Sequence, residues 1–209
     1  MAARGRLITV EGVDGAGKTT LAAGLQEALR ARGVARVEAL REPGGVVLAE
    51  AIRALVVDPA LRCDARTEAL LYAAARAQLV AERLEPLLAG GAWVVLDRFV
   101  DSSLAYQGAA RGLGVEDVRS LNAFATGGLK PDRTLLLEVE LATGRARQSR
   151  RGAAPDRLEL EAEPFFAAVA EGYAALAKAE PGRIRRLDAR SAPAEVLAAA
   201  LEAVADLLP

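Results

Sequence analysis

Eight consecutive residues near the start of the chain limit its fold more than any other part of the sequence. They fit the pattern G-x-x-x-x-G-K-[ST] and lie between the apolar run Leu7–Val10 and a segment of helical periodicity. With the threonine that follows, they read Gly12, Val13, Asp14, Gly15, Ala16, Gly17, Lys18, Thr19 and Thr20. A strand, a glycine-rich loop and a helix in this order bind phosphate, because the loop turns its N–H groups inward and the helix N-terminus attracts anions.

We therefore expect all nine residues to contribute to a binding site for ATP. Lys18 is expected to reach the β- and γ-phosphates, and the hydroxyl of Thr19 is expected to hold Mg²⁺. The alternative is a chance glycine-rich turn, which the agreement of motif and flanking elements makes improbable. The sequence contains no Asn-Lys-x-Asp segment that would read guanine, which disfavours a GTPase.

Short apolar runs alternate with longer segments of helical periodicity along the whole chain. The expected strands are Leu7–Val10, Val34–Leu40, Trp93–Leu96, Thr134–Val139 and Ile184–Leu187. The expected helices are Thr19–Ala31, Val46–Val56, Arg66–Leu88, Val115–Ala125, Leu158–Ala179 and Pro193–Leu207. This alternation predicts an α/β fold with a five-stranded parallel sheet flanked by helices. No linker or repeat interrupts it, so residues 1–209 are expected to form a single domain.

The charge balance limits the possible partners. The chain has 27 basic and 28 acidic residues and a formal net charge of -1, which argues against binding to nucleic acid or to an anionic membrane. It has no histidine and only one cysteine, Cys63, so the chemistry must rely on carboxylates, lysine, arginine and bound metal. No apolar run has the length of a membrane span, and we expect a cytoplasmic protein.

The second half of a phosphate site is expected where the run Trp93–Leu96 ends, because ligands bind beyond the carboxyl ends of parallel strands. Asp97 and Arg98 follow this run directly. A carboxylate in this place binds Mg²⁺ directly or through water, and a guanidinium beside it suits a phosphate. The alternative is an ordinary surface ion pair between the two residues.

The residues around Asp97 also carry a resemblance. The segments Asp97-Arg98-Phe99 and Ser102-Ser103-Leu104-Ala105-Tyr106-Gln107-Gly108 resemble those of thymidylate kinases, which transfer phosphate from ATP to dTMP. Other matching segments are Arg41-Glu42-Pro43-Gly44-Gly45, Thr67-Glu68, Arg76-Ala77-Gln78, Pro131-Asp132-Arg133-Thr134 and Asp156-Arg157-Leu158-Glu159. They occur in the order of the family between about Leu7 and Phe166. The resemblance implies a P-loop nucleoside monophosphate kinase fold.

The resemblance also assigns residues to the sugar and phosphate of dTMP. Asp14 matches the residue that meets the 3′-hydroxyl, and Arg53 and Arg98 match ligands of the acceptor phosphate. Arg53 could instead be a solvated helix residue. Glu42 and Pro43 match a segment in which the family has a cis peptide bond, and Glu42 could hold a Mg²⁺-bound water or the transferring phosphate.

For the base, the resemblance implies that Tyr72 lies against thymine and that Arg76 donates to its O4. The two are four residues apart, so both can face one cleft if they lie on a helix. Tyr72 could equally be a core or interface aromatic. Ser103, Tyr106 and Gln107 match contacts to the base and sugar, and Tyr106 could exclude a ribose 2′-hydroxyl.

The segment Gly144–Gly152 contains four arginines. Such a run is often only a solvated helix face. The resemblance instead implies a mobile lid at about residues 142–157, which supplies positive charge and excludes water. Family members carry a catalytic arginine either in the P-loop or in the lid. Because Gly15 and Ala16 are not basic, we expect Arg151 to be catalytic, with Arg147 assisting it.

The sequence thus predicts a thymidylate kinase with Mg²⁺ as cofactor: ATP and dTMP give ADP and dTDP, in dTTP biosynthesis. One alternative is another nucleoside monophosphate kinase or a deoxynucleoside kinase, and a nucleoside acceptor would need a base for its 5′-hydroxyl. Another is a P-loop switch protein that hydrolyses nucleotide slowly. The resemblance also implies a homodimer, for which the expected helix Arg66–Leu88 could supply the contact surface.

Overall fold

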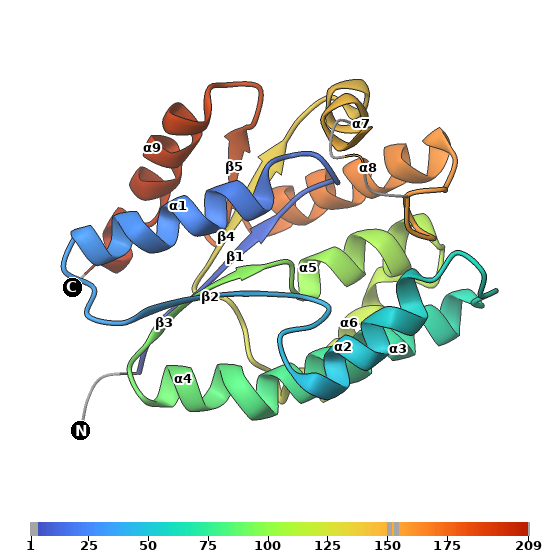
Figure 1. Ribbon diagram of the computed structural model, residues 1–209, viewed down its shortest axis with the longest axis horizontal. Helices are drawn as coiled ribbons and strands as arrows, with labels where there is room; N and C mark the ends of the chain where they lie inside the picture. Colours follow the sequence, from blue (N-terminus) through green and yellow to red (C-terminus); the bar gives the residue numbers. More distant parts are fainter. Residues whose placement is uncertain (1–3, 150–151, 153–154, 209) are drawn as a thin grey trace.

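The computed structural model describes residues 4–149, 152 and 155–208, and its centre is one parallel sheet (Figure 1). The five strands are β1 (Leu7–Glu11), β2 (Val37–Arg41), β3 (Trp93–Asp97), β4 (Arg133–Glu138) and β5 (Ile184–Asp188). They lie in the order β2-β3-β1-β4-β5, and every neighbouring pair is parallel. The predicted five-stranded parallel α/β fold is confirmed, and the P-loop leaves the central strand.

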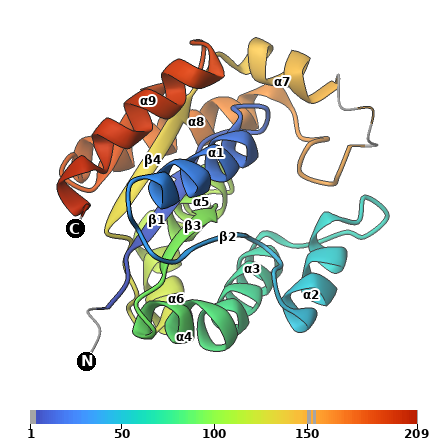
Figure 2. The same ribbon diagram turned by 60° about the vertical axis from the view of Figure 1, so that its left-hand side comes forward.

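Helices cover both faces of the sheet, and Figure 2 shows α1 and α9 on one side and α3, α4 and α6 on the other. The α-helices are α1 (Lys18–Ala31), α2 (Val47–Val57), α3 (Ala65–Leu79), α4 (Glu85–Ala89), α5 (Val100–Ser103), α6 (Val115–Thr126), α7 (Leu141–Ser149), α8 (Glu163–Ala179) and α9 (Pro193–Ala203). Two π-helices, η1 (Val80–Leu84) and η2 (Leu104–Ala110), and a 3₁₀ turn, η3 (Ala205–Leu207), complete the list. None of the helices in the described ranges is both long and apolar enough to cross a bilayer.

The alternation of side chains along each strand supplies a core on both faces. Ile8 and Val10 of β1 share one apolar cluster with Leu25 and Leu29, which lie four residues apart on α1. Leu7 points to the other face and belongs to a second cluster with residues of β3, α3, η1 and α4. The sheet is therefore buried on both sides, which holds the ends of its strands in fixed positions.

Two of the boundaries expected from the sequence were wrong. The strand expected at Val34–Leu40 begins only at Val37, because the amide of Val34 donates to Leu29 O and closes the end of α1. The helix expected at Leu158–Ala179 begins at Glu163, where Pro164 occupies the first turn. The helices α5, η2 and α7 were not predicted. The expected helix Arg66–Leu88 is present as the consecutive elements α3, η1 and α4.

Candidate active site

The P-loop closes around the ammonium group of Lys18, which is buried and donates to Val13 O at 2.9 Å. Its Nζ lies 3.7 Å from Asp14 Oδ1. Burial and the nearby charge of Arg98 lower the pKa of Lys18 to about 8. A cation held in this loop at the start of α1 is suited to a polyphosphate, which would also favour its charged form.

The P-loop also touches the backbone of α7. A Cβ atom added to Gly15 would lie 2.0 Å from the carbonyl oxygen of Gly144, and one added to Gly144 would lie 2.8 Å from Asp14 O. Gly15 has a φ of +78°, a conformation that side chains disfavour. Two glycines thus allow the predicted lid to lie directly on the loop.

Asp97 ends β3 next to the start of α1, because Asp97 lies beside Val10 of β1 in the sheet. The hydroxyl of Thr19 donates to Asp97 Oδ2 at 2.8 Å. A hydroxyl and a carboxylate beside a phosphate loop are the oxygen ligands that Mg²⁺ uses together with phosphates and waters. These two residues, as predicted from the sequence, have the chemistry for that ion.

Arg98 is the centre of the acceptor side of the site. Its Nη2 donates to Asp14 Oδ1 at 2.6 Å and its Nη1 donates to Ser102 Oγ at 3.1 Å. The guanidinium lies 5.2 Å from the ring centroid of Tyr106, a cation–π contact. Although burial alone would raise the pKa of Asp14, the charges of Arg98 and Lys18 hold it below its ordinary value. Asp14 therefore remains a carboxylate that accepts hydrogen bonds.

One cavity of about 220 Å³ joins the P-loop to this acceptor side. Its lining includes most residues predicted to bind or react, namely Asp14, Gly15, Gly17, Lys18, Thr19, Glu42, Pro43, Arg53, Tyr72, Arg76, Asp97, Arg98, Ser103, Tyr106 and Gln107. Arg41, Val57, Ser102, Asp156, Leu158 and Glu159 also line it. Residues from the P-loop, from the ends of β2 and β3, and from the helices α2, α3, α5 and η2 thus face one space.

Arg76 is almost fully buried and is held by several partners. Its Nε donates to Glu42 Oε2 at 2.7 Å, its Nη2 to Phe99 O at 2.8 Å, and its Nη1 to both Ser103 Oγ and Asn122 Oδ1. Since a guanidinium has five N–H donors, one Nη2 hydrogen remains for a further acceptor. Arg76 is therefore a fixed donor at the wall of the cavity.

Glu42 is also buried, and its Oε1 has no hydrogen-bond partner among the described residues. Burial raises its pKa to about 7, although Arg76 acts in the opposite direction. The Glu42–Pro43 peptide bond is cis, and Pro43 O accepts hydrogen bonds from Arg41 and Arg53. The contact to Pro43 O ties the guanidinium of Arg53 to the cavity wall.

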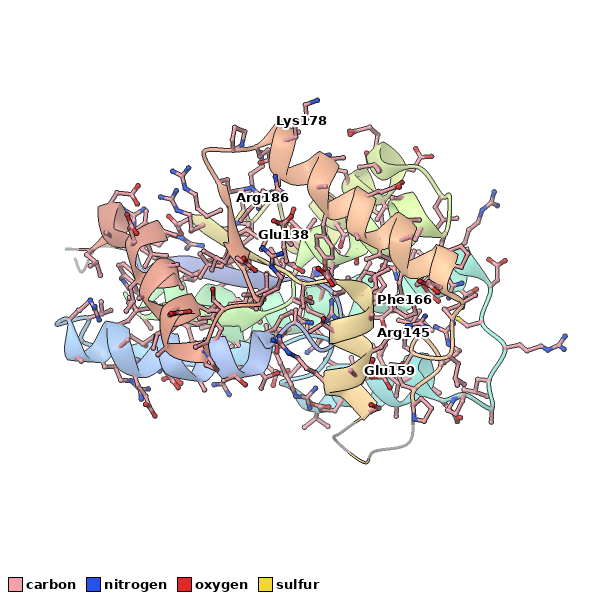
Figure 3. The ribbon with its side chains drawn as sticks, turned by 90° about the horizontal axis from the view of Figure 1, so that it is seen from above. Glu138, Arg145, Glu159, Phe166, Lys178 and Arg186 are labelled. Atoms are coloured by element: carbon pink, nitrogen blue, oxygen red, sulfur yellow. The ribbon has the colours of Figure 1, made fainter. Side chains whose placement is uncertain are left out.

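The predicted lid contains α7, and its arginines have different surroundings. Figure 3 shows Arg145 beside Phe166 of α8, with the guanidinium 5.2 Å from the ring centroid. Arg147 Nη1 donates to Ala189 O at 2.9 Å. Arg151, the predicted catalytic arginine, lies outside the described residues. After the lid, Arg157 Nε donates to Val56 O at the end of α2, so this end of the segment is tied to the acceptor side.

A second cavity, of about 480 Å³, lies on the other side of the P-loop and was missed by the sequence reasoning. It is lined by residues of the P-loop, α1, the lid and the segment after β5, including Gly15, Ala16, Gly17, Thr20, Arg147, Ala189 and Ser191. The predicted residues Ala16, Thr20 and Arg147 therefore face this cavity, whereas Gly12 and Val13 line neither cavity. The space is large enough for a planar base attached to phosphates in the loop.

Two buried carboxylates support the site, and the sequence reasoning assigned neither of them a role. Glu11 accepts hydrogen bonds from the turn after Arg98, and Glu68 accepts from Gln107 and Arg111. Arg157 Nη2 lies 2.8 Å from Glu68 Oε2. Glu11 directly precedes the P-loop, and Glu68 belongs to the segment Thr67-Glu68, so their positions next to motifs could have marked them as candidate site residues. Their hydrogen-bond partners are distant in sequence and could not have been predicted.

Comparisons with known proteins identify a family that this chain resembles over nearly its whole length. A sequence profile of the family described as thymidylate kinase matches residues 10–200. A protein of Rhizorhabdus wittichii named thymidylate kinase is 51% identical over 207 residues, which cover 98% of this chain and 99% of that protein. Proteins with the same name from Halorhodospira halophila and Alkalilimnicola ehrlichii are 46% and 50% identical, over 100% and 97% of this chain and 98% and 93% of their own lengths.

Proposed function

The chain belongs to the thymidylate kinase family, and from this we propose that it transfers the γ-phosphate of ATP to dTMP, giving ADP and dTDP, in dTTP biosynthesis. The single observation that carries the proposal is the 220 Å³ cavity, because Lys18 and Thr19 of the P-loop line it together with Tyr72, Arg76 and Arg98. A donor loop and an acceptor pocket within one cavity is the arrangement that phosphoryl transfer between two nucleotides requires.

On the donor side, the backbone of the P-loop and Lys18 bind the phosphates of ATP, and its adenine occupies the 480 Å³ cavity. Thr19 and Asp97 would hold Mg²⁺, Asp97 either directly or through a water. When bound, the ion would supply positive charge that offsets the negative charge of the phosphates.

On the acceptor side, Arg98 and Arg53 bind the phosphate of dTMP, and Asp14 accepts a hydrogen bond from the sugar 3′-hydroxyl. Tyr106 lies against the sugar. These groups neutralise the dianion and aim one of its oxygens at the γ-phosphate.

At the far end of the cavity, Tyr72 packs against thymine and the remaining Nη2 hydrogen of Arg76 donates to its O4. Cytosine has an amino group in place of O4. This group would meet the N–H donor of Arg76 with a second donor, so no hydrogen bond could form. Ser103 and Gln107 complete the base and sugar contacts, and Glu42 holds Arg76 from behind.

The reaction needs little covalent chemistry from the protein. An oxygen of the dTMP phosphate forms a bond to the γ-phosphorus of ATP while the bond from this phosphorus to the β–γ bridging oxygen breaks, and ADP leaves. The nucleophile is already anionic, so no strong general base is required. Lys18, Arg98 and the lid arginine Arg151 stabilise the charge on the transferring group, whereas Arg147 lines the cavity assigned to adenine and would have to leave Ala189 O to assist them.

The test is a coupled assay of ADP release with dTMP, dUMP, dCMP, dGMP and thymidine as acceptors, with Lys18→Ala as the inactive control. We expect dTMP to give the highest kcat/KM. An equal preference for all monophosphates would refute the assignment to dTMP, and a preference for thymidine would indicate a deoxynucleoside kinase. Slow hydrolysis without transfer to any acceptor would favour a switch protein.

We also propose that the protein is a homodimer and acts in the cytoplasm. Large apolar side chains are exposed on α2, α3 and α6, among them Val47, Leu70 and Phe124, which is 89% exposed. Light scattering should give twice the chain mass for the wild type and one chain mass for Phe124→Asp. Leu160→Asp is the control, since Leu160 is exposed outside these helices. A dimer that survives Phe124→Asp would contradict this contact surface.

The proposal that the protein acts in the cytoplasm is supported by its single cysteine, Cys63, which cannot form an internal disulfide.

A further inference from the structure

Glu11, the last residue of β1, is completely buried beneath the acceptor site. Four donors surround its carboxylate. Oε1 accepts from the amides of Phe99 at 2.8 Å and Ser102 at 3.3 Å. Oε2 accepts from the hydroxyls of Ser102 at 2.6 Å and Tyr173 at 2.9 Å. Burial raises the pKa of Glu11, and the bonds from Ser102 and Phe99 act against this rise. Four donors around two oxygens suit the ionised carboxylate.

One of the two amides is that of Phe99, the N-cap of α5, and the other is that of Ser102 in its first turn, which also donates to Phe99 O at 3.2 Å. Glu11 therefore caps this helix from a different strand, 88 residues earlier in the chain. The cap fixes the turn at Arg98, which has a φ of 70° and is the one non-glycine residue with positive φ among the described residues. Such a backbone conformation is held only by strong surrounding contacts.

The two hydroxyls connect Glu11 to the guanidinium of Arg98. Arg98 Nη1 donates to Ser102 Oγ at 3.1 Å, and Ser102 in turn donates to Glu11. Tyr173 lies 2.8 Å from Ser102 Oγ and can donate to this atom or to Glu11. In either case the proton of Ser102 points towards the carboxylate, which leaves at least one lone pair of Ser102 Oγ to accept from Arg98.

We propose that Glu11 is a positioning residue for Arg98: it holds the turn before α5 and orients the Ser102 and Tyr173 hydroxyls so that Arg98 faces the acceptor phosphate. This rests on the proposed role of Arg98 as a ligand of the dTMP phosphate. Glu11 itself lines neither of the two cavities, so it acts through Arg98 and its neighbours.

Glu11→Gln separates the two parts of this role. The amide oxygen of the glutamine can still accept from the backbone of Phe99 and Ser102, which keeps the helix cap. Its NH₂ group then points two donors at the Ser102 and Tyr173 hydroxyls. A hydroxyl that accepts from this amide must turn its proton elsewhere, and Arg98 also presents only donors. Ser102 Oγ can still accept from Arg98, but its proton has lost its anionic acceptor, so the bond from the guanidinium is weakened although the turn remains.

We expect Glu11→Gln to raise the KM for dTMP by about tenfold, the loss of one charge-assisted hydrogen bond, and to leave the KM for ATP unchanged. Tyr173→Phe removes one of the hydroxyls without adding a donor and should raise the KM for dTMP by less. The control is Glu27→Gln, the same change at an exposed position on α1. A cooperative urea unfolding curve for each variant shows that the fold is retained.

The decisive comparison places each change in an Arg98→Ala background. If Glu11 acts through Arg98, Glu11→Gln has no further effect on the KM for dTMP in that background. The proposal is overturned if the effect is the same in both backgrounds, or if KM for ATP and dTMP rise together. If Glu11→Gln does not fold, Tyr173→Phe in the two backgrounds decides in the same way. If Arg98→Ala alone leaves the KM for dTMP unchanged, the proposed phosphate role of Arg98 fails first and this inference fails with it.

Discussion

Glu42 should make the stability of this protein fall as the pH rises. The residue is 5% exposed, and its carboxyl group pairs with Arg76 through one oxygen and has no described partner for the other. Burial raises its pKa to about 7 in the folded chain, from an ordinary value of 4.5. Replacement by glutamine removes the ionisable group while keeping the size of the side chain.

The expected size of the effect follows from these two pKa values. Below the unfolded pKa both states carry the proton, and between the two values only the folded state keeps it. The stabilisation present below 4.5 is therefore lost as the pH rises through about 7. At about 1.4 kcal/mol per pKa unit, the loss is about 3 kcal/mol in all. Most of it, about 2–3 kcal/mol, should fall between pH 5 and pH 8.

Urea unfolding at pH 5 and pH 8, without nucleotides, measures this directly. The free energy of unfolding of Glu42→Gln minus that of the wild type should increase by about 2–3 kcal/mol from pH 5 to pH 8. The variant gains in relative stability because only the wild type loses the contribution of Glu42. Glu27→Gln, at an exposed position, serves as the control for the substitution itself. A difference between Glu42→Gln and wild type that is the same at both pH values would refute the reasoning.

Three further predictions concern catalysis, the lid contact and the core. Arg151→Ala should lower kcat by about 10³-fold or more with small changes in KM, measured by ADP release, whereas Arg145→Ala on the same segment should not. Gly15→Ala should lower kcat/KM for ATP by roughly 10²-fold, because its Cβ collides with α7; Gly33→Ala, which also has positive φ but open space around it, should leave kcat/KM unchanged. Leu25→Ala should lower the free energy of unfolding by about 2–5 kcal/mol in urea, with no change in KM, since Leu25 is fully buried.

Local sequence was sufficient for the elements that carry their own signals. The P-loop pattern, the apolar run before Asp97 and the periodicity of α1 depend on residues that are adjacent in the chain, and each lies where it was expected. The helix α5 and the helix η2 that continues it could not be predicted in this way. The amide at the start of α5 donates to Glu11, which lies at the end of β1 and far away in the sequence. A helix whose first amides are satisfied from far away leaves no capping residue in its own sequence.

The candidate site shows the same limit. The motifs brought Arg76 and Glu42 to the same cavity, but they did not predict that the two would pair with each other or that Glu42 would keep one oxygen free. These facts depend on distances between segments, and the raised pKa of Glu42 follows from them rather than from its neighbours in sequence. The sequence motifs could predict that Arg76 and Glu42 lie near one another, but not that they form an ion pair.

The contact between Gly15 and Gly144 has a consequence for how such enzymes can change over evolution. A side chain at position 15 would place its first carbon 2.0 Å from the backbone of α7, so a longer one, such as an arginine, has no room while that helix keeps its place. Moving the proposed catalytic charge from the lid into the loop would therefore require the helix to shift in the same event, because the substitution in the loop alone has no room.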